Sequence, residues 1–248
     1  MKTRTIKTLF PLIVLGFLLT FSTGCDDSGT ENPPAENGQV TDADGNVYST
    51  VTIGTQVWMV ENLKTTKLND GTAISLGETW TYPSTPTYCW YNSDIANKGI
   101  YGALYNWYAV NTGKLAPTGW HIPTYEDWTT LENYLIANGY NYDGTSVGNK
   151  YAKSLSATTT WTSSMYTGVP GSVDYPTFRN KSGFNAVPAG VRIEIGEYYH
   201  ISNATYWWSS TEISAKWAEI RSIVYNAVDV SSGSYSKSTG LSVRCIKN

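Results

Sequence analysis

The sequence has few of the residues that metal sites and nucleophilic catalysis use. Among its 248 residues only His121 and His200 are histidines, and there are three cysteines. Neither histidine has a partner at metal-ligand spacing, and the chain contains no nucleophile-elbow, P-loop or dinucleotide-binding motif. We therefore predict no catalytic residue, no metal site and no cofactor. We interpret His121 as a half-buried histidine whose ring is hydrogen-bonded.

Acidic residues are the one type of catalytic residue that the sequence does not exclude. Glycoside hydrolysis needs two carboxyl groups that are close in space, whatever their separation along the chain. The candidates are Glu126, Asp127, Glu212 and Glu219. Glu126 and Asp127 also suit a helix N-terminus, where negative charge is favourable. We expect a protein that is not an enzyme, with an unrecognised hydrolase as an alternative.

Charged residues make up only 15% of the chain, and they form no basic run. This excludes the positively charged surface that nucleic-acid binding requires. The chain also has only one long apolar run, from Leu9 through Phe21, which is shorter than the ~20 residues that a membrane span needs. No transmembrane helix is therefore predicted.

The N-terminal region has the pattern of a bacterial lipoprotein signal peptide. Basic residues precede the apolar run, and small residues lead to Cys25. We predict that residues 1–24 are removed and that Cys25 is lipidated, with an ordinary secretory signal as the alternative. Cleavage removes three basic and no acidic residues, which leaves 14 Lys+Arg against 20 Asp+Glu and a net charge of −6. We expect the lipid to attach the protein to the outer membrane or cell surface.

Residues 25–40 are polar, acidic and rich in proline and glycine, and they contain no aromatic residue. This composition predicts a flexible tether. The acidic residues directly after Cys25 also resemble the surface-export signals of some lipoproteins. The next segment, Asp42–Asn46, has a spacing of acidic residues that does not fit a calcium-binding EF-hand loop, so we interpret it as a turn.

Cys89 and Cys245 are the cysteines that remain after Cys25. In an oxidising exported compartment two such residues can pair, and closing a loop of 156 positions stabilises a fold by roughly 4–5 kcal/mol. The sequence does not show whether their Cα atoms are close enough. A Cys89–Cys245 disulfide and two free thiols therefore remain as alternatives.

Aromatic residues are abundant, with 10 tryptophans and 19 tyrosines, so the core is expected to contain many large rings. The best-marked element is a helix that begins after Thr124, which can cap it together with Asp127. Asn138 and Gly139 end this helix. Its apolar stripe consists of Trp128, Leu131 and Leu135.

Short strand-like runs surround this helix. The predicted strands are a hairpin of residues 47–53 and 56–60, followed by 205–212, 217–225 and 241–246. A weaker helix is predicted over 148–155. The predicted loops and turns cover residues 72–88, 157–182, 197–200 and 226–240. The pattern indicates one α+β domain over residues 41–248.

Six sequence blocks resemble one known family, and they occur in its order. The blocks are Asp44–Tyr48, Trp58–Leu63, Tyr101–Trp107, Pro117–Pro123, Tyr206–Glu212 and Ser242–Cys245. Over about residues 41–247 the chain resembles the FISUMP family, the Fibrobacter major paralogous domain. The resemblance implies an exported protein or lipoprotein, and no activity is established for the family as a group.

The resemblance also implies a C-type-lectin-like fold, because the family looks like a distant relative of the C-type-lectin-like and formylglycine-generating-enzyme superfamily. The segment 123–128 is similar to the Leu-Pro-Thr-x-x-Glu-Trp motif of that superfamily. The paired catalytic cysteines of the formylglycine generators and the calcium triplets of sugar-binding lectins have no counterpart here. Many FISUMP members carry a cysteine at the position of Ala116, and the resemblance implies that it is the usual partner of Cys245.

These observations lead to a hypothesis of function. We expect a lipid-anchored cell-envelope protein with a non-catalytic binding or adhesion domain for glycans or surface polymers. Because flat rings stack on sugars, we expect Tyr198, Tyr199 and Tyr235 to contact the ligand from loops at 157–204 and 226–240. The alternatives are an enzyme of the formylglycine-generating-like superfamily and a structural component that contacts other envelope proteins.

Overall fold

The structure is a computed structural model that describes residues 38–248. The predicted signal peptide, Cys25 and the tether up to residue 37 lie outside the described residues. Residues 38–248 belong to one compact unit. Within residues 38–248, no helix has both the length and the apolar character needed to span a membrane.

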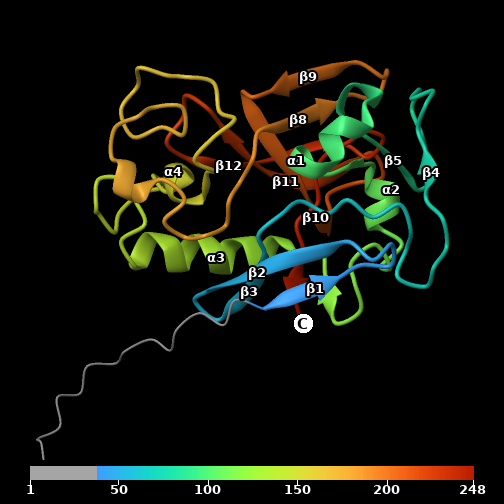
Figure 1. The fold of residues 1–248 in the computed structure, drawn as a ribbon, viewed down its shortest axis with the longest axis horizontal. Helices are drawn as coiled ribbons and strands as arrows, with labels where there is room; N and C mark the ends of the chain where they lie inside the picture. Colours follow the sequence, from blue (N-terminus) through green and yellow to red (C-terminus); the bar gives the residue numbers. More distant parts are fainter. Residues whose placement is uncertain (1–37) are drawn as a thin grey trace, which may run out of the picture. The chain divides into compact units, whose positions relative to one another are not determined.

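The described chain is built mainly of three small sheets (Figure 1). The first has the order β1 (Gln39–Thr41), β2 (Val47–Ile53), β3 (Gln56–Met59), β13 (Ile246–Lys247) and β7 (Trp120–His121). The second has the order β12 (Val230–Ser236), β11 (Trp217–Val224), β10 (Ala204–Glu212), β8 (Ala189–Arg192) and β9 (Tyr198–Ile201). The third has the order β4 (Ser75–Leu76), β5 (Thr87–Cys89) and β6 (Leu104–Tyr105). Neighbouring strands are antiparallel except in the pairs β4–β5 and β10–β8.

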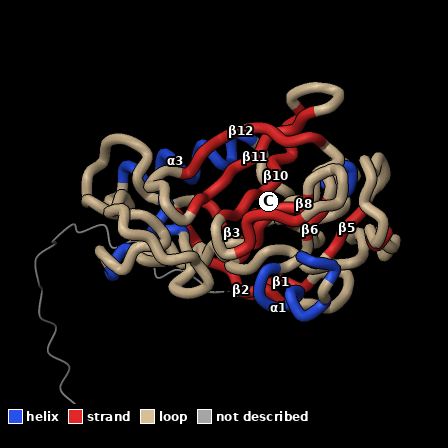
Figure 2. The backbone as a smooth tube through the Cα atoms, turned by 90° about the horizontal axis from the view of Figure 1, so that it is seen from above, coloured by secondary structure: helices blue, strands red, loops and turns tan. Residues whose placement is uncertain are grey.

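Helices are few between residues 38 and 248, and only one of them is longer than about one turn. The α-helices are α1 (Lys98–Tyr101), α2 (Trp107–Val110), α3 (Tyr125–Ala137) and α4 (Ala152–Leu155). The 3-10 helices are η1 (Tyr91–Ser93), η2 (Ile95–Asn97) and η3 (Pro176–Phe178). Figure 2 shows the strands in the middle of the unit, with much of the loop structure gathered around its ends. Mostly antiparallel strands with few helices agree with the α+β class predicted from the sequence.

The β2–β3 hairpin forms as predicted. Ile53 faces Gln56 at the end of the two strands, and Gly54 makes the turn with a φ of +63°. On its other side β3 pairs with β13, the last strand, through Trp58 and Ile246. The first hairpin and the end of the chain therefore lie side by side (Figure 1).

Helix α3 also begins as predicted. The Thr124 hydroxyl accepts a hydrogen bond from the backbone N–H of Asp127 at 3.1 Å, and Asp127 Oδ2 accepts one from the backbone N–H of Thr124 at 2.9 Å. This reciprocal pair is a capping box. The helix ends at Ala137, and Gly139 then turns the chain with a φ of +74°. The buried residues of the helix are the predicted Trp128, Leu131 and Leu135.

The core beneath α3 is largely aromatic. The ring centroid of Trp128 lies 4.9 Å from that of Trp58 and 5.9 Å from that of Trp207. Phe184 packs against all three rings. Such pairs contribute about 0.5–1.5 kcal/mol each beyond the area that they bury. Trp128 is thus at the packing centre, as expected, whereas Trp120 is only partly buried.

Strands form in several segments that were predicted to be loop, turn or tether, and β4 and the start of β5 in the predicted loop 72–88 are examples. Residues 198–201, expected to be mostly loop, form β9, and residues 230–236 of the expected serine-rich turn form β12. β12 pairs with β11 along its whole length, because the backbone ladder of a neighbouring strand can order a sequence with little β-propensity of its own. Gln39 and Val40, assigned to the tether, belong to β1 and pair with β2.

Two predicted elements are shorter than expected. The weak helix predicted over residues 148–155 is confined to α4. In the last predicted strand, residues 241–246, only Ile246 lies in a named strand. Leu241 and Ser242 form isolated bridges to Tyr105 and Trp207 instead. These bridges connect the end of the chain with the second and third sheets.

Candidate functional site

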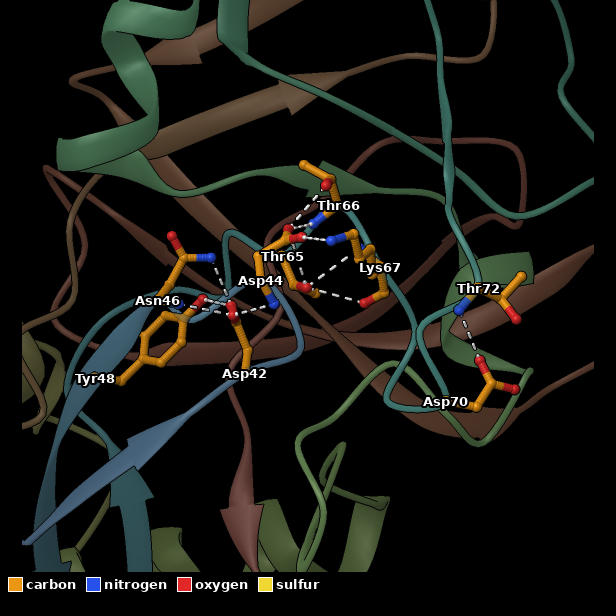
Figure 3. Close-up of polar contacts among 9 residues, drawn as sticks. All are labelled: Asp42, Asp44, Asn46, Tyr48, Thr65, Thr66, Lys67, Asp70 and Thr72. Atoms are coloured by element: carbon orange, nitrogen blue, oxygen red, sulfur yellow. Dashed lines mark hydrogen bonds and ion pairs between the residues drawn. The ribbon is translucent and has the colours of Figure 1, made fainter.

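The Asp42–Asn46 segment is a turn, as predicted from its sequence (Figure 3). Asp42 Oδ1 accepts hydrogen bonds from the backbone N–H groups of Asp44 and Asn46, each at 2.9 Å. Asp42 Oδ2 accepts a hydrogen bond from the hydroxyl of the buried Tyr48. The Asp42 carboxylate is therefore occupied by donors of its own chain.

Asp44 attaches this turn to residues 65–67 (Figure 3). Its Oδ2 accepts hydrogen bonds from the backbone N–H and the hydroxyl of Thr66, and Lys67 Nζ lies 3.3 Å from Oδ1. Burial alone raises the pKa of Asp44, but these donors outweigh it and lower the pKa. Within residues 38–248, no three His, Cys, Asp or Glu side chains are placed to hold a metal ion. The cluster is a structural link between the first hairpin and the segment after it.

His121 is the half-buried, hydrogen-bonded histidine that the sequence predicts, with 39% of its side chain exposed. Its Nε2 lies 3.1 Å from Asp127 Oδ2, and its Nδ1 lies 2.7 Å from Asn248 Oδ1. It lines a pocket of about 260 Å³ together with Ser210. Because the ring nitrogens contact an amide and a carboxylate rather than a nucleophilic hydroxyl or thiol, this arrangement is not a catalytic triad.

The three tyrosines predicted to contact a ligand do not share one surface. Tyr198 and Tyr199 are neighbours on β9, so their side chains point to opposite sides of the strand. Tyr198 packs on Tyr91 with ring centroids 5.1 Å apart, whereas Tyr199 is exposed. Tyr235 lies on β12 and packs edge-on against Tyr206 at 5.5 Å. Two of the three rings therefore cover the core.

The Cys89–Cys245 disulfide considered from the sequence is not formed. Both cysteines are free and buried, and burial raises the pKa of both thiols. The fold places them in separate clusters. Cys89 packs with Trp80 and Leu104, while Cys245 belongs to the larger cluster that also contains Ala116.

The four candidate acids are not brought together either. Asp127 is held by the capping box of α3. Glu126 is exposed on the first turn of that helix, and Glu212 makes an ion pair with Lys237. Of the four acids, only Glu219 lines a surface groove that is larger than the pocket at His121. This groove is the candidate functional site.

The groove has a volume of about 460 Å³ and lies between the start of α3 and the strands β10, β11 and β12. It is lined by Tyr125, Thr211, Ile213, Glu219, Ser232, Gly233 and Ser234. In the strand register Glu219 faces Ser234, so the two side chains lie on the same face of the sheet. The backbone N–H of Tyr125 donates a hydrogen bond to the Thr211 hydroxyl at 2.9 Å, which holds the helix start against β10.

Glu219, the one charged residue that lines the groove, forms a buried ion pair with Arg221, which we call the groove floor. Arg221 Nη1 donates a hydrogen bond to Glu219 Oε1, and the two side chains are only 4% and 7% exposed, respectively. The Arg221 guanidinium lies 5.1 Å from the centroid of the exposed Tyr125 ring. Glu219 Oε2 is buried and has no hydrogen-bond partner among residues 38–248. The groove thus combines an aromatic ring and hydroxyl groups with Glu219, whose unpaired carboxylate oxygen lies beneath the surface.

The sequence predicts only some of the residues of this site. It identified Glu219 as an acid and Tyr125 as part of the helix start, but it missed Arg221, Ser232 and Ser234. Alternation along the predicted strand 217–225 was an available signal, because it places Glu219 and Arg221 on one face. The two serines had no such signal, because their segment was expected to be a turn.

Several of the blocks that carry the family resemblance meet in the core. Asn62 Oδ1 accepts hydrogen bonds from Trp207 Nε1 at 2.9 Å and from Arg244 Nη2 at 3.0 Å. Arg244 Nη1 also donates to the backbone carbonyls of Met59 at 2.9 Å and Phe184 at 2.6 Å. Arg244 is completely buried, and burial lowers its pKa to about 9. These shared residues therefore build the core of the domain.

Comparison with known proteins supports the family resemblance seen in the sequence blocks. The family model described as Fibrobacter succinogenes major domain matches residues 51–247. No curated protein and no solved structure matches the chain. The matched region contains both the buried Asn62–Arg244 network and the Glu219 groove. Since the match covers most of the sequence, the chain belongs to the Fibrobacter succinogenes major domain family, the FISUMP family that its sequence blocks predicted.

Proposed function

We propose that this chain is a lipid-anchored protein of the cell envelope whose domain binds glycans or other surface polymers without transforming them. The basic residues, the apolar run and the position of Cys25 support the lipid anchor at the outer membrane or cell surface. The groove beside α3 supports the binding role. Its combination of ring, hydroxyls and carboxylate is the observation that carries the proposal.

The lining of the groove suits a sugar. Apolar faces of sugar rings stack on aromatic rings, and the Tyr125 ring is 46% exposed. Thr211, Ser232 and Ser234 offer hydroxyls for hydrogen bonds with a polar ligand. Hydrolysis of a glycoside commonly uses two carboxyl groups about 5–9.5 Å apart, and Glu219 is the one carboxylate among these lining residues. The lining therefore favours binding over hydrolysis.

We further propose that the domain has the C-type-lectin-like fold implied by the family resemblance. Its support lies in two sequence blocks. The segment similar to the superfamily motif forms the capped start of α3, and the segment Tyr206–Glu212 forms most of β10. β10 then lies beside the closing segment of the chain through the bridge from Trp207 to Ser242.

Binding to a glycan array tests the proposed ligand class. The detergent-purified full chain is applied to the array, and Tyr125→Ala is compared with Tyr175→Ala. Tyr175 is the matched control, because the exposed fractions of the two tyrosines are 46% and 42%. We expect Tyr125→Ala to remove binding and Tyr175→Ala to retain it. Absence of binding to every glycan and surface polysaccharide would contradict the proposal.

Membrane fractionation tests the proposed anchor. We expect the unmodified chain in the membrane fraction and Cys25→Ser in the soluble exported fraction, because the serine hydroxyl cannot replace the lipidated thiol. Labelling with a radioactive fatty acid provides a direct readout of Cys25 acylation. A Cys25→Ser chain that stays in the membrane fraction would show that something other than this lipid attaches the protein.

A further inference from the structure

We propose that the groove beside α3 selects an uncharged sugar, and that a hydroxyl of this sugar donates a hydrogen bond to the unpaired Glu219 carboxylate oxygen. This inference rests on the proposed glycan binding and adds the chemical class of the ligand and the residue that recognises it. Three features of the groove support it.

The first feature is the unpaired carboxylate oxygen. Glu219 Oε1 is bound to Arg221, but Glu219 Oε2 is buried without a partner among the described residues. Buried polar groups are almost always hydrogen-bonded, because an unsatisfied one has lost water without replacement. Glu219 also lines the groove. Because Oε2 has almost no accessible surface, a ligand O–H donor reaches it when the side chains that line the groove move aside, and it then completes the hydrogen bonds of this carboxylate.

The second feature is the charge balance of the groove floor. The Arg221 guanidinium already pairs with Glu219, so the buried pair has no net charge. A uronic acid would bring a second carboxylate toward Glu219, and an ammonium group would bring a second cation toward Arg221. Either ligand would also lose the hydration of its charge, which is more costly than the desolvation of a hydroxyl. An uncharged hydroxyl avoids both costs.

The third feature is the position of the Tyr125 ring. Its backbone is fixed to β10 by the Thr211 hydroxyl, and its ring lies over the Arg221 guanidinium at 5.1 Å. The ring is therefore held beside the same ion pair whose carboxylate is unpaired. A sugar that stacks on Tyr125 can direct a hydroxyl to Glu219 at the same time. Ile213, which is 55% exposed, adds apolar surface to the groove.

Calorimetry with the detergent-purified full chain tests this inference. The probes are three sets of oligosaccharides of equal length: neutral hexoses, uronic acids and amino sugars. We expect the neutral set to bind at least about ten-fold more tightly than either charged set, which corresponds to about 1.4 kcal/mol. A preference for either charged set would overturn the proposed ligand class.

Glu219→Gln tests the role of the carboxylate. Glutamine can turn its carbonyl oxygen to Arg221, and its amide nitrogen, a donor, then faces the ligand. We expect neutral-sugar binding to weaken roughly ten-fold, because the hydrogen bond to a charged carboxylate is replaced by a weaker one in which the sugar hydroxyl accepts from the neutral amide. Glu212→Gln on the neighbouring β10 is the control, because that acid pairs with Lys237 outside the groove lining, and it is expected to leave binding unchanged.

A second pair of variants tests the groove independently, in case Glu219→Gln does not fold. Ser234→Tyr fills the groove, whereas Ser231→Tyr adds the same side chain to the opposite face of β12. We expect only Ser234→Tyr to abolish binding. If Ser234→Tyr abolishes binding while a folded Glu219→Gln binds normally, the role of Glu219 is wrong but the proposed glycan binding stands. If the unmodified chain binds no glycan, the proposed function and this inference both fail.

Discussion

Asn62 and Arg244 are separated by 182 positions in the sequence, yet their side chains meet in the core, where Asn62 Oδ1 lies 3.0 Å from Arg244 Nη2. The same oxygen accepts the indole N–H of Trp207, and the Asn62 amide donates to the backbone carbonyl of Tyr101 at 2.9 Å. Four of the family sequence blocks therefore contribute to one buried polar network. The network holds a completely buried guanidinium in place through directed acceptors.

Replacing the Asn62 side chain tests the importance of this network. Asn62→Leu removes the acceptor of Arg244 and Trp207 and leaves both donors short of a partner. We expect the free energy of unfolding to fall by about 3 kcal/mol, because two buried donors, the Arg244 guanidinium and the Trp207 indole N–H, lose the acceptor that they share. Urea unfolding followed by tryptophan fluorescence measures the change. The exposed Asn226, replaced by alanine, is the control and is expected to change stability by less than about 0.5 kcal/mol.

The state of the cysteines gives a second prediction. In a Cys25→Ser variant we expect two free thiols in denaturant without reductant, from Cys89 and Cys245. In the native protein both thiols are expected to react slowly, because they are buried and burial raises their pKa. Titration with a thiol reagent measures both conditions. A thiol count that rises by two after reduction would show a disulfide that this structure lacks.

The buried Lys153 gives a third prediction about the long loop at residues 157–182. Lys153 Nζ lies 2.8 Å from Asp174 Oδ1 and donates to the backbone carbonyls of Val169 and Ser172. We expect Lys153→Met to destabilise the domain by about 2–3 kcal/mol, because the buried carbonyls of Val169 and Ser172 lose the charged donor that they share with Asp174. We also expect limited proteolysis to cut first within this loop.

The control for that experiment is Lys150→Met. Lys150 makes an ion pair with Asp143, but its side chain is 35% exposed. Exposed ion pairs contribute little to stability. Equal protease sensitivity of Lys150→Met and Lys153→Met would contradict a special role for the buried lysine.

Buried tyrosines give a fourth prediction, which concerns alkaline pH. Burial raises the pKa of Tyr48, Tyr105 and Tyr151 above the ordinary value of 10. The folded state therefore holds these protons more tightly than the unfolded state. Their contribution to stability is complete below the unfolded pKa and is lost as the pH rises above it.

We therefore expect the free energy of unfolding to decrease steadily above pH 10. Tyrosinate absorbance is expected to rise in two steps, first for exposed tyrosines and then together with unfolding. Parallel measurement of absorbance and circular dichroism distinguishes the steps. A chain that ionises all its tyrosines near pH 10 while it remains folded would contradict the predicted burial.

The sequence by itself determined the elements that depend on local interactions. The α3 capping box uses Thr124 and Asp127, three positions apart, and the β2–β3 hairpin follows from alternating residues around Gly54. The family also follows from the sequence, because its blocks can be recognised without knowing where they meet. The serine-rich β12 was missed because its order comes from pairing with β11 rather than from its own side chains.

Only the tertiary structure decided which distant side chains share a site. Tyr125, Glu219 and Ser234 come together because α3 begins beside β10 and because β11 and β12 pair in one particular register. The same packing separates Cys89 from Cys245. Hydrogen bonds between residues close in the sequence are encoded locally. Whether Glu219 Oε2 finds a partner depends instead on which side chains from distant parts of the chain pack around it.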